Sequence, residues 1–442
     1  MRAVVLESVI LSAFGAVLLG SLLFHVKIVY ALLVGLCLFE GYALARSFSW
    51  REVLSMCWRG VKTTRGLLLL FVLIGLLTAL WRASGTIPVI VSYASNLIHP
   101  QSFILVAFLL NAAMSLLTGS ALGTAATMGV ICATMAQTMG INPAWVGGAI
   151  LSGSYFGNRL SPISSMALLT ANITGTEIYS NVRNMLRTSW FPLLLSCAVY
   201  LVVGFCFSGE LGEVALSSAK SVRELFAQEF SLSLWGVLPA ILMVVLSMLR
   251  VKSSRVLLSS ALCALVIALL VEYRDVASLW EFLVYGFHSQ MPDLSKMING
   301  GGLLSMVNVF LIVFIAGCFG GIFKGTELLS PLKKCVCFLE KSTNSFVAML
   351  VASIVAACVS CNQTLTIILT NQLTSSAERS PEHQALDLYD TAVTVIALVP
   401  WSVATSIVLV AAQASSISVC CACFLYLLPL SRLFTCRHKT QK

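Results

Sequence analysis

Four polar stretches interrupt apolar segments of this chain, and their residue types suit a small ion or a polar solute. They are TGSALGT (118–124), SYFGNRLSPIS (154–164), SCNQT (360–364) and LVPWS (398–402). Their hydroxyl, amide and carbonyl oxygens can replace the water shell of a small cation. The site groups expected from them are Thr118, Gly119, Ser120, Asn158, Ser161, Ser164, Asn362, Gln363, Thr364 and Ser402.

Each polar stretch is expected to break a helix, because it contains residues that resist helical geometry. Proline removes a main-chain donor and clashes with the preceding turn, which predicts breaks at Pro162 and Pro400. Glycine adopts conformations that other residues resist, which adds Gly157. A broken helix exposes amides and carbonyls with the partial charges of the helix dipole. The alternative is that these serines and threonines only join neighbouring helices.

Charged residues inside apolar segments are functional candidates by default. Asp390 lies ten residues before Pro400, which is about 15 Å along a helix and fits either the midplane or the mouth of the membrane. Arg159 is expected to balance Asp390 or to attract an anionic group. Glu40 lies near Arg46 at the end of an apolar segment, so it is interpreted as an interfacial residue.

The elements that must position these residues are apolar helices. The chain has 442 residues, of which 58% are hydrophobic and 10% charged, and its mean hydropathy is +0.94. Soluble domains carry about 25% charged residues. Repeated apolar runs, each near the roughly 20 residues that cross a bilayer, predict an all-α polytopic bundle of about 10 to 13 spans. The lipid bilayer is therefore an expected partner.

Charge along the chain predicts its topology. The segments 46–65 and 250–255 and the C-terminal tail are basic, and 209–232 and 272–296 are acidic. The positive-inside rule places the basic segments and both termini in the cytoplasm. This explains the net charge of +9 without nucleic-acid binding. Most of the fifteen cysteines lie in apolar runs as small hydrophobes, and no metal site or cofactor is expected.

The two halves of the chain follow the same order of elements. The predicted organisation is an N-terminal repeat (1–208), a polar connecting loop (209–232), a C-terminal repeat (233–431) and a basic cytoplasmic tail (432–442). In this pairing TGS lies over CNQ (361–363), and LSPIS lies over LVPWS. One half has a basic amphipathic stretch and the other an acidic one, so inverted-topology repeats are predicted.

These motifs resemble the NhaC family of sodium/proton antiporters over nearly the whole chain. The matching stretches are 83–98, 116–130, 147–164, 298–306, 360–373 and 390–402. The resemblance implies inverted repeats with broken helices and hairpins, with Asp390 at an acidic family position. The family stretch G-D-K-x-S-P-x-S-D is altered, because Asn158 and Ser165 replace its two carboxylates and Arg159 replaces its lysine.

The leading hypothesis is a secondary, NhaC-like Na⁺/H⁺ antiporter that works by alternating access, with Na⁺ and/or H⁺ as transported ions and Asp390 as the protonatable group. One alternative is exchange of an organic anion or amino acid attracted by Arg159, with weakened or absent sodium coupling. Another is a transport-inactive relative. The absence of H-E-x-x-H and G-x-S-x-G motifs argues against an enzyme. A bacterial inner membrane is expected, and oligomeric state stays open.

Overall fold

The computed structural model describes residues 2–24, 28–94, 99–162, 164–208, 224, 226–249, 251–289, 291, 294–295, 298–326, 336, 343–374 and 380–437. These residues form helices and connecting turns, with one isolated β-bridge, between Phe287 and Gly300. The all-α polytopic fold is thus confirmed. The inverted orientation of the halves stays a prediction, and most of the predicted connecting loop 209–232 lies outside the described residues.

The N-terminal half contains the first series of helices. Their bounds are α1 Arg2–Leu23, α2 Ile28–Ala45, α3 Trp50–Ala83, α4 Thr86–Ala94, α5 Pro100–Thr118, α6 Ala121–Thr124, the π-helix η1 Ala125–Gly129, α7 Val130–Thr138, α8 Pro143–Leu160, α9 Ser165–Thr174 and α10 Ile178–Ser208.

The C-terminal half contains the second series, in which short 3₁₀ turns join several helices. Their bounds are η2 Leu234–Val237, α12 Leu238–Met248, α13 Ser253–Leu270, α14 Val276–Tyr285, η3 Leu304–Met306, α16 Val307–Thr326, α18 Ser345–Ser360, α19 Gln363–Leu373, α20 Pro381–Asp390, α21 Ala392–Val395, η4 Ile396–Leu398, α22 Val403–Ala411, η5 Ser416–Cys421 and α23 Cys423–Arg437.

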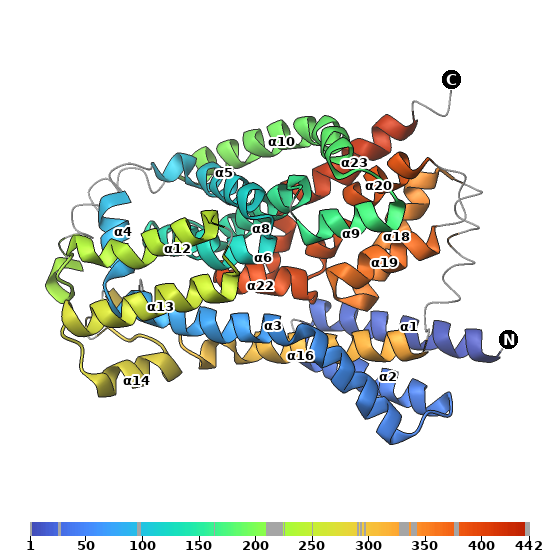
Figure 1. Ribbon diagram of the computed structural model, residues 1–442, viewed down its shortest axis with the longest axis horizontal. Helices are drawn as coiled ribbons and strands as arrows, with labels where there is room; N and C mark the ends of the chain where they lie inside the picture. Colours follow the sequence, from blue (N-terminus) through green and yellow to red (C-terminus); the bar gives the residue numbers. More distant parts are fainter. Residues whose placement is uncertain are drawn as a thin grey trace.

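Few of these helices are, by themselves, both long enough and apolar enough to cross a membrane. Within the described chain, α5 and the Ile178–Cys206 part of α10 do so, and the bent pair Pro381–Leu398 and Val403–Ala411 makes a third if it forms one span. The other apolar helical segments of the described chain are shorter, at 10–17 residues. In Figure 1 the helices run mostly along the long axis, and α1 begins and α23 ends at the same end of it.

Helix α3 combines an amphipathic stretch and an apolar run that are distinct in the sequence pattern. The amphipathic stretch that begins at Trp50 and the apolar run that ends near Trp81 form one helix of 34 residues. Ser49 and Glu52 form a capping box at its start, which satisfies free amides of the first turn. Its backbone closely approaches that of α16, because a Cβ at Gly60 would collide with the carbonyl oxygen of Gly317. The amphipathic stretch is therefore a rigid extension of a core helix.

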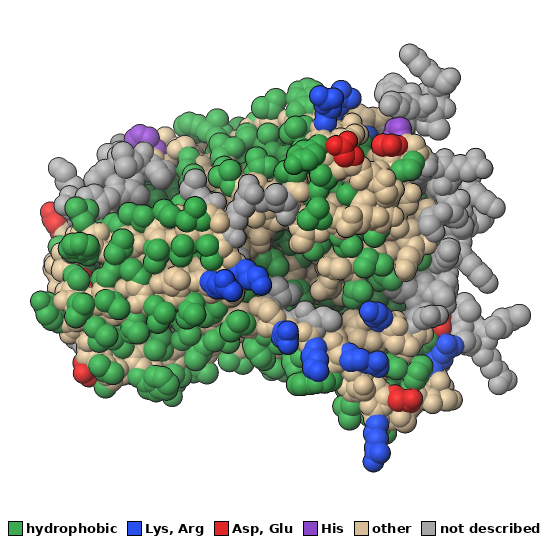
Figure 2. Space-filling model, in the orientation of Figure 1, with side chains coloured by type: hydrophobic (Ala, Val, Ile, Leu, Met, Phe, Trp, Pro, Cys, Tyr) green, Lys and Arg blue, Asp and Glu red, His purple; other side chains and the backbone are tan. Residues whose placement is uncertain are grey.

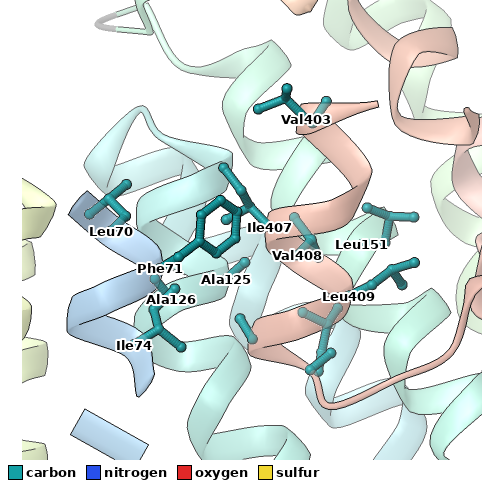
Figure 3. Close-up of a cluster of buried hydrophobic side chains, with 14 of the residues drawn as sticks. Leu70, Phe71, Ile74, Ala125, Ala126, Leu151, Val403, Ile407, Val408 and Leu409 are labelled. Atoms are coloured by element: carbon teal, nitrogen blue, oxygen red, sulfur yellow. The ribbon is translucent and has the colours of Figure 1, made fainter. Parts of the chain in front are cut away.

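Apolar side chains join α3 to the helices that carry the breaks. Figure 3 shows Phe71 of α3 pointing toward Ile407 and Val408 of α22, with Ala125 of η1 beside them. Figure 2 shows apolar side chains over α12, α13 and α14, and Lys and Arg gathered across the middle of this face and over α2 and α3. Lys252, between α12 and α13, and Arg59, in α3, are exposed basic residues.

Candidate transport site

The first break lies between α5 and α6. Helix α5 ends at Thr118, Gly119 takes the left-handed conformation with φ 68°, and Ser120 caps α6 by accepting from the amide of Gly123 at 3.0 Å. Glycine has no Cβ and takes this conformation without strain. The hydroxyls of Thr118 and Thr124 lie 3.1 Å apart across the break. The predicted break is confirmed, and it is two residues long.

The third break has the same local structure. Helix α18 ends at Ser360, Cys361 takes the left-handed conformation with φ 52°, and Asn362 caps α19 by accepting from the amide of Thr364 at 3.0 Å. The hydroxyls of Ser360 and Thr366 lie 2.7 Å apart. Cysteine is an unusual residue at positive φ. The structure therefore pairs Cys361 with the glycine of the first break, one residue away from the register expected from the sequence.

The second break is shorter than predicted. Helix α8 continues to Leu160, so Gly157 lies inside the helix and its assignment as a break residue is wrong. A Cβ at Gly157 would collide with the carbonyl oxygen of Ala112, so glycine is required there for close packing of α8 against α5. Pro162 lies in the break, which ends where Ser164 caps α9. The hydroxyl of Ser164 also donates to Oδ1 of Asn158 at 2.8 Å.

The fourth break contains Pro400 and divides a helical segment whose two parts meet at 59°. Ser402 caps α22 by accepting from the amide of Thr405 at 3.1 Å, and its hydroxyl donates to the carbonyl of Ile396 at 2.8 Å. The amide of Val403 donates to the carbonyl of Cys361 at 2.9 Å. The third and fourth breaks are thus hydrogen-bonded to each other.

The helices that follow the breaks pack across the two halves. Helix α6 contacts α22 and α8, and α19 contacts α9. The side chain of Gln363 donates to the carbonyl of Val393 at 2.9 Å, which ties α19 to α21. Ser161, Ser164 and Ser402 are fully buried. The predicted polar groups therefore lie on one network of packed, interrupted helices inside the protein.

Asp390 is the last residue of α20, and Thr391, with φ −119° and ψ −84°, interrupts the helix directly after it. The Asp390 side chain is fully buried. One oxygen accepts from Nη2 of Arg159, and the other lies 2.9 Å from Nε of Arg432. The expected pairing of Arg159 with Asp390 is confirmed. The interruption at Thr391 was not predicted.

The charged cluster has four members, Arg159, Asp387, Asp390 and Arg432. Nη2 of Arg432 donates to Oδ1 of Asp387 at 2.7 Å. Arg159 also donates to the carbonyl of Tyr389 at 3.2 Å and to the hydroxyls of Thr188 and Ser189. Two positive and two negative side chains balance, which is the condition for burying charges in an apolar protein.

Two of the four members were missed in the sequence. Arg432 was assigned to a basic tail (432–442), but α23 continues to Arg437 and holds Arg432 against α20. Asp387 is three residues before Asp390, so both lie on the same face of one helix. This spacing is the signal that could have found Asp387. Arg432 has no comparable signal, because only the fold brings it there.

A cavity of about 880 Å³ adjoins the charged cluster. It lies between α10, α18, α20 and α23, and it is open to the surface. Asp387 and Arg432 reach its wall, and the guanidinium of Arg432 lies over the ring of Phe346, 5.4 Å from its centre. The cavity therefore leads from the surface to the charged cluster, with Arg187, Glu382 and His383 along the way.

Interrupted helices that meet around buried polar groups, in a bundle of apolar helices, are the architecture of secondary transporters. Comparison with known proteins gives the family. The chain belongs to the Na⁺/H⁺ antiporter family, whose model matches residues 1–170 and 153–435. The resemblance found in the motifs is thus confirmed, and the chain is an integral, multi-pass membrane protein and a secondary antiporter. Membership indicates a transporter rather than an enzyme.

The relatives differ in what their names say they carry. The chain is 28% identical over 392 residues to the Na⁺/H⁺ antiporter NhaC of Bacillus subtilis, covering 86% of this chain and 85% of that one. It is 27% identical over 372 residues to the malate-2H⁺/Na⁺-lactate antiporter of the same organism, covering 83% and 78%. It is 25% identical over 287 residues to the arginine/ornithine antiporter ArcD of Halobacterium salinarum, covering 64% and 59%.

Proposed function

We propose that the protein exchanges Na⁺ for H⁺ by alternating access, and that Asp390 is the group that binds the transported proton. The observation that carries this proposal is the position of Asp390 between Arg159 of α8 and Arg432 of α23. A proton on Asp390 removes its charge and weakens both ion pairs at once. Helices α8 and α23 are then less tightly held to α20, so proton binding favours movement between them.

Neutral oxygens on α8 and at the second break support the sodium half of the proposal. The hydroxyls of Ser154 and Ser161 are buried and have no hydrogen-bond partner among the described residues. Ser161 follows Arg159 by two residues, at the second break. Hydroxyl and carbonyl oxygens can hold Na⁺ without carboxylates, although Asn158 and Ser165 supply none of the negative charge found at the family positions.

Sodium-driven proton movement in proteoliposomes tests this function. Wild-type protein is expected to move protons when a Na⁺ gradient is applied, and Asp390→Asn to abolish the movement. Asp275→Asn is a matched control, because Asp275 is exposed and its side chain does not cap α14. Ser161→Ala is expected to raise the Na⁺ concentration needed for half-maximal exchange. Exchange that survives in Asp390→Asn contradicts the role of Asp390.

A second candidate is exchange of an organic anion or amino acid, and the cavity beside Arg432 favours it. A volume of about 880 Å³ exceeds what a bare cation needs. A substrate carboxylate could replace Asp390 on Arg432 once Asp390 is protonated. Two relatives are named for organic substrates, malate with lactate and arginine with ornithine. Radiolabelled malate, lactate and arginine, each loaded inside proteoliposomes, separate this candidate from Na⁺/H⁺ exchange. The alternative of a transport-inactive relative requires no flux in any of these assays.

The proposed location is a bacterial cytoplasmic membrane with both termini inside the cell. Support comes from the basic residues of α3 and of the α12–α13 connection, which the positive-inside rule places in the cytoplasm. A fluorescent protein that folds only in the cytoplasm, fused to the C-terminus, is expected to be fluorescent. The only small ligands that the proposed exchange requires are the transported ions. Activity is therefore expected without added organic cofactors.

A further inference from the structure

A second buried arginine lies outside the charged cluster. Arg82 is in the last turn of α3, and it is 1% exposed. Nη1 donates to the carbonyl of Thr78 at 2.8 Å, and Nη2 donates to Oε1 of Gln413 at 3.2 Å. No carboxylate of the described residues lies within ion-pair distance of Arg82. A buried positive charge with neutral partners alone is costly in an apolar protein.

Within the described chain, only some of the hydrogen-bond donors of the Arg82 guanidinium have a partner. Its Nε is buried and has no hydrogen-bond partner among the described residues. Nε and Nη2 form one edge of the guanidinium, with two parallel N–H groups that match the two oxygens of a carboxylate. The amide oxygen of Gln413 accepts from Nη2, which is one of the two nitrogens of this edge. A carboxylate can accept from both Nε and Nη2, whereas Gln413 uses Nη2 alone.

A cavity of about 300 Å³ lies beside Gln413, the side-chain partner of Arg82. It is lined by residues of α7, by the turn between α7 and α8, and by Gln413 after α22. Gln137 and Gln413 are exposed at the cavity, whereas Arg82 lies behind Gln413. Gln413 has φ 49°, in the left-handed region that is uncommon for residues other than glycine. The cavity has room for a small organic molecule but for nothing larger.

We propose that this cavity is a binding site for a small carboxylate, with Arg82 as the residue that binds it. The carboxylate replaces Oε1 of Gln413 and accepts from both Nε and Nη2 of Arg82. Gln413 swings aside and acts as a neutral substitute for the ligand when none is bound. The site is separate from Asp390, since Arg82 lies in the last turn of α3, at the opposite end from the capping box. It goes beyond the proposed exchange of Na⁺ and H⁺, because it assigns an anionic ligand to the protein.

Calorimetric titration of the purified full-length protein tests the site. The probes are succinate and its uncharged analogue succinamide, added in sodium-free buffer at constant ionic strength with chloride as the other anion. Succinate is expected to bind and succinamide to fail, because only a carboxylate matches the fork. Arg82→Gln is expected to weaken succinate binding at least about tenfold, since the charge-assisted hydrogen bonds are lost. Arg82→Lys keeps the charge without the fork, so its affinity for succinate should lie between that of wild type and that of Arg82→Gln.

Gln413→Ala gives a result that misfolding cannot imitate. It removes the group that competes with the carboxylate for Nη2, so it is expected to strengthen succinate binding. Arg51→Gln is the matched control, because Arg51 is an exposed arginine at the other end of α3 and should not affect binding. Succinate binding that is lost in Arg82→Gln belongs to this site, whereas binding that remains in Arg82→Gln belongs to the cavity beside Arg432. Equal succinate affinity in Arg82→Gln and wild type, or no binding by wild type, overturns the proposal.

Discussion

Removing the charge of Asp390 should destabilise the protein strongly, because its partner Arg159 is fully buried. Both side chains are 0% exposed. Breaking a buried ion pair by removing one partner costs about 3–5 kcal/mol, since the other charge is left uncompensated. In Asp390→Asn, Arg159 keeps only neutral partners, whereas Arg432 keeps Asp387. We therefore expect a loss of about 3–5 kcal/mol in the free energy of unfolding.

The same reasoning ranks the other members of the cluster. The side chains of Arg432 and Asp387 are 14% and 10% exposed, so water screens them in part. Arg432→Gln should cost about 1.5–3 kcal/mol, the range for a hydrogen bond to a charged group. The double variant Arg159→Gln with Asp390→Asn should cost at least about 1 kcal/mol less than the sum of the single variants, because it leaves no lone charge.

Unfolding by SDS in mixed micelles, followed by circular dichroism, measures these free energies. Asp275→Asn, at an exposed carboxylate, should change the free energy of unfolding by less than about 0.5 kcal/mol. The reasoning is refuted if Asp390→Asn costs under about 1 kcal/mol, or if the two single costs add without coupling. Either result would mean that water reaches the cluster and compensates Arg159.

Four further substitutions test the local structure of the breaks and their packing, with the same unfolding measurement. Gly157→Ala should destabilise by about 1–3 kcal/mol, because its Cβ meets the backbone of α5, whereas Gly41→Ala, with open space around it, should be neutral or stabilising. Gly119→Ala should destabilise by about 1 kcal/mol, since its new Cβ would be strained in the left-handed conformation; no cost would argue against this conformation at the first break. Ser120→Ala and Asn362→Ala should each cost about 1 kcal/mol as lost helix caps, and no cost at either position would contradict the capping geometry.

The sequence predicts the breaks well because their causes are local. The αL conformation at Gly119, the caps at Ser120 and Asn362, and the missing donors of the prolines depend on residues within one turn. The break at Thr391 escapes this reasoning, because Asp390 and Thr391 are only weak helix formers and lack the strong signal of glycine or proline. Gly157 shows the opposite error, because a glycine that permits close helix packing has the same local sequence signal as one that breaks a helix.

The charged cluster also contains residues that the sequence can predict and residues that it cannot. The sequence predicts the Arg159–Asp390 pair as one of two alternatives for Arg159, because opposite charges in apolar segments tend to pair. Arg432 could not be placed, because a basic residue near the C-terminus follows the positive-inside rule whether or not it is buried. Only the packing of α23 against α10 and α20 distinguishes the two cases. Arg82 was missed for a related reason, since an arginine in the last turn of a helix also fits a simple interaction with the helix dipole.

The charged cluster and the helix breaks share the same helices, and this joins proton binding to the neutral groups of the site. Arg159 lies two residues before the second break, and Asp390 is the last residue before the interruption at Thr391. An ion pair between them therefore fixes the ends of two interrupted helices relative to each other. Under the proposed role of Asp390, a proton on its side chain weakens the hold on the end of α8, where the hydroxyl of Ser164 donates to Asn158. A single proton can thus change the geometry of uncharged oxygens within one turn of it, without any carboxylate among them.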